Sequence, residues 1–186
     1  MNNKRVCHSG EESGYILVVT IFVMILMLLL FVAFYSRISN NTDMSAATFW
    51  HDKSIMAANT ALPSLELDIN AAAQNGPLEY ESSALPSWYQ NVPYNQVTAP
   101  VFSTWTNCAS QSLTSGNNCY TYSNNGFNIS EIVQPTGLHN QYVCGASGLE
   151  AVYYNVYINA LPVNNQTKGQ AGAVVQTVYR LCVKEN

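Results

Sequence analysis

Few side chains in this chain have the type and spacing that catalysis or metal binding requires. The sequence contains no Asp beyond Gly76, which argues against Asp-containing triads, aspartyl dyads and Asp-rich calcium loops in that region. His139 has no H-E-x-x-H context. Ser147 lies in Gly-Ala-Ser-Gly, where the second Gly comes one residue too early for a G-x-S-x-G nucleophile elbow. We therefore expect no enzymatic activity, no metal site and no cofactor.

The cysteines are the residues whose chemistry the sequence does indicate. Cys7 lies near the N-terminus, and four more lie in the second half of the chain: Cys108, Cys119, Cys144 and Cys182. In a small exported domain, these four predict two disulfides, with three possible connectivities. Zinc is the competing interpretation, but the sequence has no C-x-x-C pair. Cys108 and Cys119 bracket the turn-forming segment ASQSLTSGNN, which favours a disulfide that closes this loop.

The longest apolar run of the chain, Tyr15 to Tyr35, predicts a membrane helix. It has 21 residues and contains no charge, no Gly and no Pro. At about 1.5 Å rise per residue it spans about 30 Å, which is the thickness of the hydrocarbon core of a bilayer. Its only hydroxyl-bearing residues are Thr20 and the two terminal tyrosines, so it lacks the polar stripe of a helix on a soluble domain.

The short polar segment before this run, residues 1–14, predicts its orientation. Lys4 and Arg5 favour a cytoplasmic N-terminus and export of the rest of the chain. The apolar run is longer than the roughly 7–15 residues of a secretory signal, and no A-x-A-like site follows it. Two interpretations remain open: a signal anchor that keeps its leader, or a leader that a protease on the cytoplasmic side cuts at a Gly before the run.

We expect the helix to continue beyond the membrane through residues 36–75. Residues in steps of three and four form a stripe typical of an amphipathic helix: Met44, Ala47, His51, Ile55, Ala58, Leu62, Leu65, Ile69 and Ala72. Gly76-Pro77 predicts the end of the helix, and Pro63 should kink it.

This stripe has two interpretations. From Ile55 onward, we expect it to pack on the chain's own domain. The segment Ser36 to Phe49, together with the apolar run, is instead expected to pack against sister helices in an assembly. His51 lies on the stripe and is expected to be a packed core or boundary residue and not a ligand.

The part of the chain after the helix is expected to be rich in β-strand. Ala151–Ala160 and residues 173–183 both alternate apolar and polar side chains, and the polar segment between them predicts an antiparallel hairpin. The apolar face of this hairpin should cover the amphipathic part of the helix, while Cys182 ties the last strand to the chain near Cys144. Between residues 77 and 142 we expect loops with short strands. The expected fold class is therefore α+β.

The order of these segments resembles the type IV pilin family: a leader that ends in Gly, an apolar helix that becomes amphipathic, and a small disulfide-bearing β domain. The segment SGYILVVTIFVMILMLLLFVAFYSR is similar to the start of PilX-type minor pilins, and VYYNVYINAL and AVVQTVYRLCV are similar to the closing strands of that group. The resemblance covers both ends of the chain and not the middle. It implies a leader (1–14), a transmembrane half-helix (15–35), an amphipathic half-helix (36–75) packed on the sheet, and an exported globular domain (76–186).

The resemblance also implies how the chain matures. A prepilin peptidase would cut between Gly14 and Tyr15, and Tyr15 would then be N-methylated. Gly10 is the rival cleavage position, but a cut there would leave Glu11 and Glu12 before the apolar run.

The fifth residue after the expected cut, Val19, departs from the family pattern, because most pilins carry Glu at this position. In the family, that carboxylate is thought to pair with the N-terminal amine of the preceding subunit. An ionisable group inside a membrane is costly unless it is paired. Its absence therefore suggests a subunit without a predecessor, and the same absence occurs in the pseudopilin that caps type II secretion filaments.

The function that the resemblance implies is a minor pilin that primes or caps type IV pilus assembly at the filament tip and supports adhesion or twitching motility. Its expected location is the bacterial inner membrane before assembly and the pilus tip or cell surface afterwards. The expected partners are other minor and major pilins, the prepilin peptidase, the inner-membrane assembly platform and a large tip adhesin. A net charge of −4 gives no reason to expect nucleic acid. Two alternatives stay open: a pseudopilin of type II secretion or DNA uptake, and a signal-anchored surface adhesin or sensor.

Overall fold

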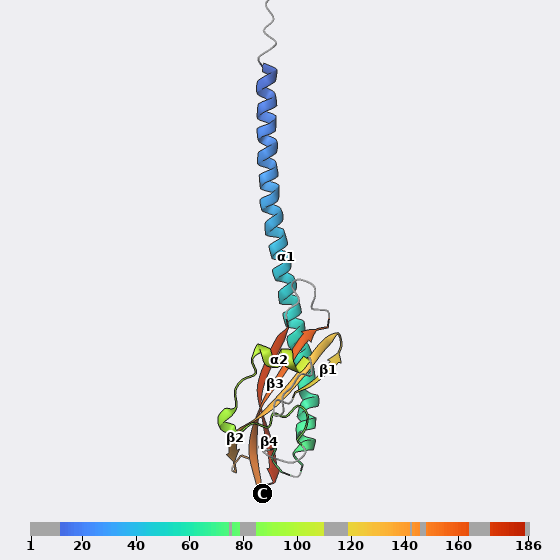
Figure 1. Cartoon of the computed structure of the whole chain (residues 1–186), viewed down its shortest axis with the longest axis vertical. Helices are drawn as coiled ribbons and strands as arrows, with labels where there is room; N and C mark the ends of the chain where they lie inside the picture. The colour runs from blue at the N-terminus through green and yellow to red at the C-terminus, as the bar shows by residue number, and fades with distance from the viewer. Residues whose placement is uncertain are drawn as a thin grey trace, which may run out of the picture. The chain divides into compact units, whose positions relative to one another are not determined.

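The structure, a computed structural model, describes residues 12–74, 76–78, 85–109, 119–141, 143–145, 148–163 and 172–184. Its elements are α1 (Glu12–Ala72), the 3-10 helix η1 (Tyr94–Gln96), α2 (Phe102–Ala109), β1 (Tyr120–Asn124), β2 (Phe127–Asn140), β3 (Leu149–Pro162) and β4 (Ala173–Lys184) (Figure 1). Two compact units divide the chain, Met1–Ser45 and Ala46–Asn186, and α1 contributes to both. Most of the leader, with the rival cleavage position Gly10, lies outside the described residues, as does Ser147.

α1 is a single helix of 61 residues, as the apolar run and the amphipathic stripe predict. Its first half is rich in Leu, Met and other residues that tolerate helix well, and no Gly interrupts it beyond Gly14. Pro63 lies inside the helix without ending it. In the first unit, every described side chain from Gly14 to Ser45 is exposed.

In the second unit, α1 packs against one face of a four-stranded antiparallel sheet with the strand order β1-β2-β3-β4. The helix and the sheet share one apolar core, with these members among others: Ala58, Ala61, Leu65 and Ile69 from α1, and Ile129, Val133, Val156 and Ile158 from the strands. The two alanines allow the helix to approach the sheet closely. The α+β fold class, with a long N-terminal helix, an antiparallel sheet and two disulfides, is confirmed.

The predicted hairpin is the β3–β4 pair, whose register runs from Leu149 opposite Lys184 to Ala160 opposite Ala173. The predicted apolar face of β3, from Val152 to Ala160 at alternate residues, is buried in the core under α1. On β4, Tyr179 also faces this side, since the Asn70 amide of α1 donates a hydrogen bond of 2.8 Å to its hydroxyl.

The prediction of short strands between residues 77 and 142 was wrong for β2, which has 14 residues. The strand contains Pro135 and Gly137, two residues that are uncommon inside strands. Both lie where the β2–β3 register shifts, between Pro135 and His139, and a bulge tolerates a residue without an amide proton. Within the shift, the Thr136 hydroxyl donates a 2.6 Å hydrogen bond to the carbonyl oxygen of Tyr153, so the strand continues past the irregularity.

Of the two positions expected for His51, packed core or boundary, the packed core was wrong, because this residue is exposed. Its Nδ1 lies 3.2 Å from the carbonyl oxygen of Gly172 at the edge of the domain. The buried face of α1 passes through Ala58, as predicted, and through Ser54 and Ala61, which were not on the predicted stripe. Small residues decide which face approaches the sheet, and the apolar stripe alone did not reveal this.

Candidate functional site

The most unusual surface of the chain is the apolar half-helix, residues Tyr15–Tyr35 of α1. Its large side chains are exposed, for example 62% for Phe22, 68% for Met24 and 69% for Phe31. Soluble proteins rarely expose a continuous apolar surface of this extent, which indicates contact with lipid or with other apolar helices. Among the described residues, Gly14–Ala72 is the helix long and apolar enough to cross a membrane, with a mean hydropathy of 3.3 in its most apolar window. This helix is compatible with a single-pass membrane anchor.

The polar groups inside the apolar half-helix are satisfied locally. The Thr20 hydroxyl donates a hydrogen bond of 2.8 Å to the carbonyl oxygen of Leu17, one turn earlier. A hydroxyl paired in this way costs little in lipid. Beside it, Val19 presents an apolar side chain at the helix surface, where it is 40% exposed.

Gly14 and Tyr15, the residues at the predicted cleavage position, lie near the start of α1. A Cβ atom at Gly14 would meet nothing within 4 Å, and Tyr15 is 73% exposed. The peptide bond between them lies in the first turn of α1. Cleavage and N-methylation remain predictions.

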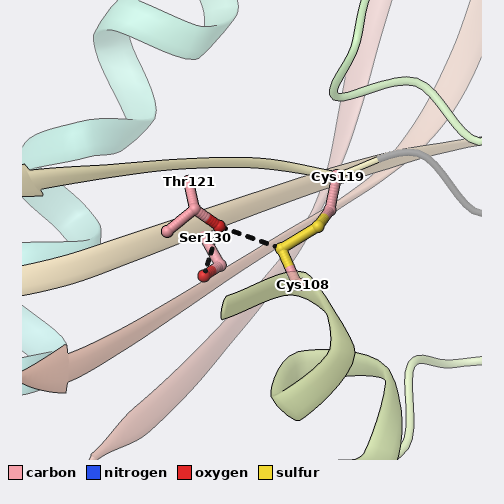
Figure 2. The surroundings of a disulfide bond; sticks show 4 residues. All are labelled: Cys108, Cys119, Thr121 and Ser130. Carbon is pink, nitrogen blue, oxygen red and sulfur yellow. Dashed lines mark hydrogen bonds between the residues drawn. A yellow bond between two sulfur atoms is a disulfide. The ribbon is translucent and has the colours of Figure 1, made fainter. Parts of the chain in front are cut away.

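The first disulfide joins Cys108 at the end of α2 to Cys119 just before β1, with their Cα atoms 5.9 Å apart (Figure 2). The Thr121 Oγ1 lies 3.0 Å from the Cys108 sulfur. A disulfide sulfur carries no proton, so Thr121 is the donor. Ser130 Oγ lies 3.1 Å from Thr121 Oγ1 and therefore donates to it. This chain of hydrogen bonds connects α2, β1 and β2 on the sheet face opposite α1.

The second disulfide joins Cys144 to Cys182 of β4, again with Cα atoms 5.9 Å apart. It links residues 38 positions apart, whereas the first links residues 11 apart. Of the three possible connectivities, the structure therefore has the one that joins Cys108 to Cys119 across the turn-forming loop and Cys182 of the last strand to Cys144.

A buried acid, Glu131, is the main feature that the sequence reasoning missed. Its side chain is 2% exposed and lies under α1, where the Tyr122 hydroxyl donates a 2.9 Å hydrogen bond to its Oε1. Burial raises the pKa of Glu131 to about 7, the hydrogen bond from Tyr122 opposes this shift, and the charge of Asp68 adds to it. Burial and the neighbouring Glu131 likewise raise the pKa of Tyr122. The period-two pattern Ile129, Glu131, Val133 could have revealed the buried position.

His139 has a partner that its sequence context did not suggest. Its Nδ1 lies 3.1 Å from Oε2 of Glu150, across the β2–β3 pair. Among the described residues, no three His, Cys, Asp or Glu side chains lie close enough together to hold a metal ion.

Comparisons of this chain with family models, curated proteins and solved structures gave no match. Functional inference therefore rests on the residues and their geometry.

Proposed function

We propose that this chain is a minor pilin of the type IV pilin family, of the PilX type, that primes or caps filament assembly. The observation that carries the proposal is the single helix α1, 61 residues long. Its segment Tyr15–Tyr35 exposes large apolar side chains, while its later part forms one core with a disulfide-bearing antiparallel sheet. This combination suits a subunit that is held in a membrane by its helix and then incorporated into a bundle of similar helices.

Assembly of this kind needs no enzymatic chemistry. The apolar half-helix leaves lipid and packs against neighbouring helices, so one apolar environment replaces another. Packing between side chains and the loss of ordered lipid contacts then provide the stabilisation. The hydrogen bond of the Thr20 hydroxyl within its own helix supports this exchange. Because this hydroxyl already has a partner, it needs none from lipid or from a neighbouring helix.

Val19 supports a position at the tip. A subunit inside the shaft of a pilin filament would use a carboxylate at this position to pair with its neighbour, whereas Val makes no such pair. The first subunit of a filament has no neighbour ahead of it and loses nothing by this change. The domain then lies outside and presents its loops, with the Cys108–Cys119 disulfide, to other minor pilins or to a tip adhesin.

The proposal is tested by the fate of the leader. Mass spectrometry of the protein from sheared surface fibres should find N-methylated Tyr15 as the first residue. Gly14→Val should abolish cleavage and keep the protein in the membrane fraction; the structure has open space for the added side chain, so its fold should not change. Gly10→Val is the matched control and should mature normally.

An intact leader on protein that reaches the cell surface would favour a signal-anchored adhesin or sensor. A deletion strain with normal piliation and failed protein secretion would favour a pseudopilin of type II secretion. Either result would contradict the proposed pilus function.

A further inference from the structure

A polar groove runs between α1 and β1 in the second unit. One wall is Thr60, Ser64 and Asp68 of α1, four residues apart and so on one helix face. The other wall is Tyr120, Tyr122 and Asn124, alternate residues of β1 and so on one strand face. Ala61 and Glu131 complete the lining. The groove has a volume of about 260 Å³, which is below the range typical of drug-sized ligands and suits a small group.

The lining of this groove defines the chemistry of its ligand. Every lining residue except Ala61 carries a hydroxyl, amide or carboxyl group, and none of them is basic. An apolar ligand would take the exposed carboxylate of Asp68 and the exposed amide of Asn124 out of water without offering them hydrogen bonds, at a cost for each one. A phosphate or sulfate would be repelled by the exposed carboxylate of Asp68. The groove therefore disfavours apolar and anionic ligands and favours a ligand with many hydrogen-bonding groups.

The two tyrosines add a flat apolar surface to this polar lining. Tyr120 is 46% exposed, and its ring lies 5.6 Å from that of Tyr122 at an interplanar angle of 33°. Tyr122 is half-buried and held by its hydrogen bond to Glu131, so it supports the exposed ring beside it. A ligand that uses both features must have an apolar face together with an edge of hydroxyl groups.

We propose that this groove binds one hexose unit of a saccharide, with the sugar ring packed on Tyr120 and its hydroxyl groups bonded to Asp68 and Asn124. The Asp68 carboxylate accepts two hydrogen bonds from neighbouring hydroxyls, and the Asn124 amide both donates and accepts. Thr60 and Ser64 each donate to a carbonyl oxygen of their own helix, so their oxygens act as acceptors for the ligand. This binding activity is separate from filament assembly and does not depend on it.

The test uses the full-length protein in lauryldimethylamine oxide micelles, since sugar detergents would compete. Saturation-transfer NMR with the methyl glycosides of glucose, galactose, mannose and N-acetylglucosamine should show contact with at least one, at a dissociation constant of about 1 mM. Cellotetraose, a short oligomer of glucose, is tested as well. It shows whether the groove recognises a hexose unit inside an oligosaccharide or a free single sugar. Tyr120→Ala and Asp68→Asn should each weaken binding by about tenfold.

Tyr94→Ala is the matched control, because Tyr94 is a 42% exposed tyrosine that does not line the groove. It should bind as the parent does. Asn124→Ala provides a second groove variant at an exposed strand end in case Tyr120→Ala misfolds. The proposal is overturned if no saccharide in the panel receives saturation transfer, if the groove variants bind like the parent, or if the diamine cadaverine binds more tightly than every saccharide.

Discussion

At the scale of single residues, Glu131 links the packing of α1 to pH. Its pKa in the folded protein, about 7, lies above the ordinary value of 4.5, so the folded state holds a proton that the unfolded state has released between these values. The stabilisation is complete below about pH 4.5 and is lost as pH rises through 7. A shift of this size corresponds to at most roughly 3 kcal/mol.

Glu131→Gln should therefore stabilise the protein at pH 8 and flatten the fall in stability between pH 4.5 and 7, because Gln stays uncharged and still accepts a hydrogen bond from Tyr122. Urea unfolding of the parent and the variant at several pH values measures this. Asp52→Asn, on an exposed part of α1, is the control and should leave the slope unchanged. Parallel profiles for Glu131→Gln and the parent would contradict the assignment.

Residues differ in how well the sequence predicted them. Leu65 and Ile69 were recognised as core from the helical period, and both are fully buried. His51 was placed on the packed stripe but is exposed, and Ser54 was left off the stripe but is buried. The helical period alone does not distinguish a bulky polar residue at the edge of a core from a small one inside it. Glu131 was missed because a charged residue is normally exposed, and only its Tyr122 partner explains its burial.

At the scale of elements, the irregularity in β2 depends on one glycine. Gly137 has a φ of 68°, and an added Cβ would lie 2.8 Å from the ring of Tyr94. Gly145 has nearly the same φ, 67°, with nothing within 4 Å of its Cβ position. Comparing alanine variants at Gly137 and Gly145 therefore distinguishes the cost of backbone strain, which both share, from the cost of steric overlap with Tyr94, which only Gly137 has.

Gly145→Ala should cost about 1 kcal/mol of unfolding free energy from backbone strain alone. Gly137→Ala should cost about 1–3 kcal/mol more, because the ring of Tyr94 must move. Denaturant unfolding of both variants measures the difference, and Tyr94→Ala should recover part of it in the Gly137→Ala background. Equal losses in the two variants would mean that the contact with Tyr94 is unimportant.

The two disulfides should contribute unequally. A cross-link between residues 38 apart restricts the unfolded chain more than one between residues 11 apart. Replacing Cys144 and Cys182 by Ser should destabilise the domain by about 4 kcal/mol, compared with about 3 kcal/mol for Cys108 and Cys119. Thermal unfolding of both double variants under oxidising conditions tests this order, and a larger loss for the shorter loop would show that the hydrogen bonds around Cys108 dominate.

At the scale of the whole molecule, the sequence predicted the elements whose patterns are long. The apolar run, the amphipathic stripe and the alternating strands β3 and β4 all extend over ten residues or more, and each was assigned the correct structure. The middle of the chain was not predicted in detail, because Pro135 and Gly137 interrupt the pattern of β2 and α2 has only eight residues. Their positions depend on contacts with distant residues, such as Trp105 of α2 with Ile132 and Tyr157.

The position of Val19 gives the sharpest test of how the whole molecule acts. Val19→Glu introduces a carboxyl group into the apolar half-helix, where an unpaired charge costs up to about 3 kcal/mol. If the subunit has no predecessor in the filament, this group finds no amine partner, so the variant should reduce the number of surface pili and remain in the membrane. Val19→Leu keeps the surface apolar and should behave as the parent, which separates charge from shape. Counting pili by electron microscopy in strains that carry each variant measures the effect.

The contradicting outcome is normal or increased piliation with Val19→Glu, with the variant present along the fibre. The carboxyl group would then pair with a preceding subunit, and the chain would belong to the shaft of the filament and not to its tip.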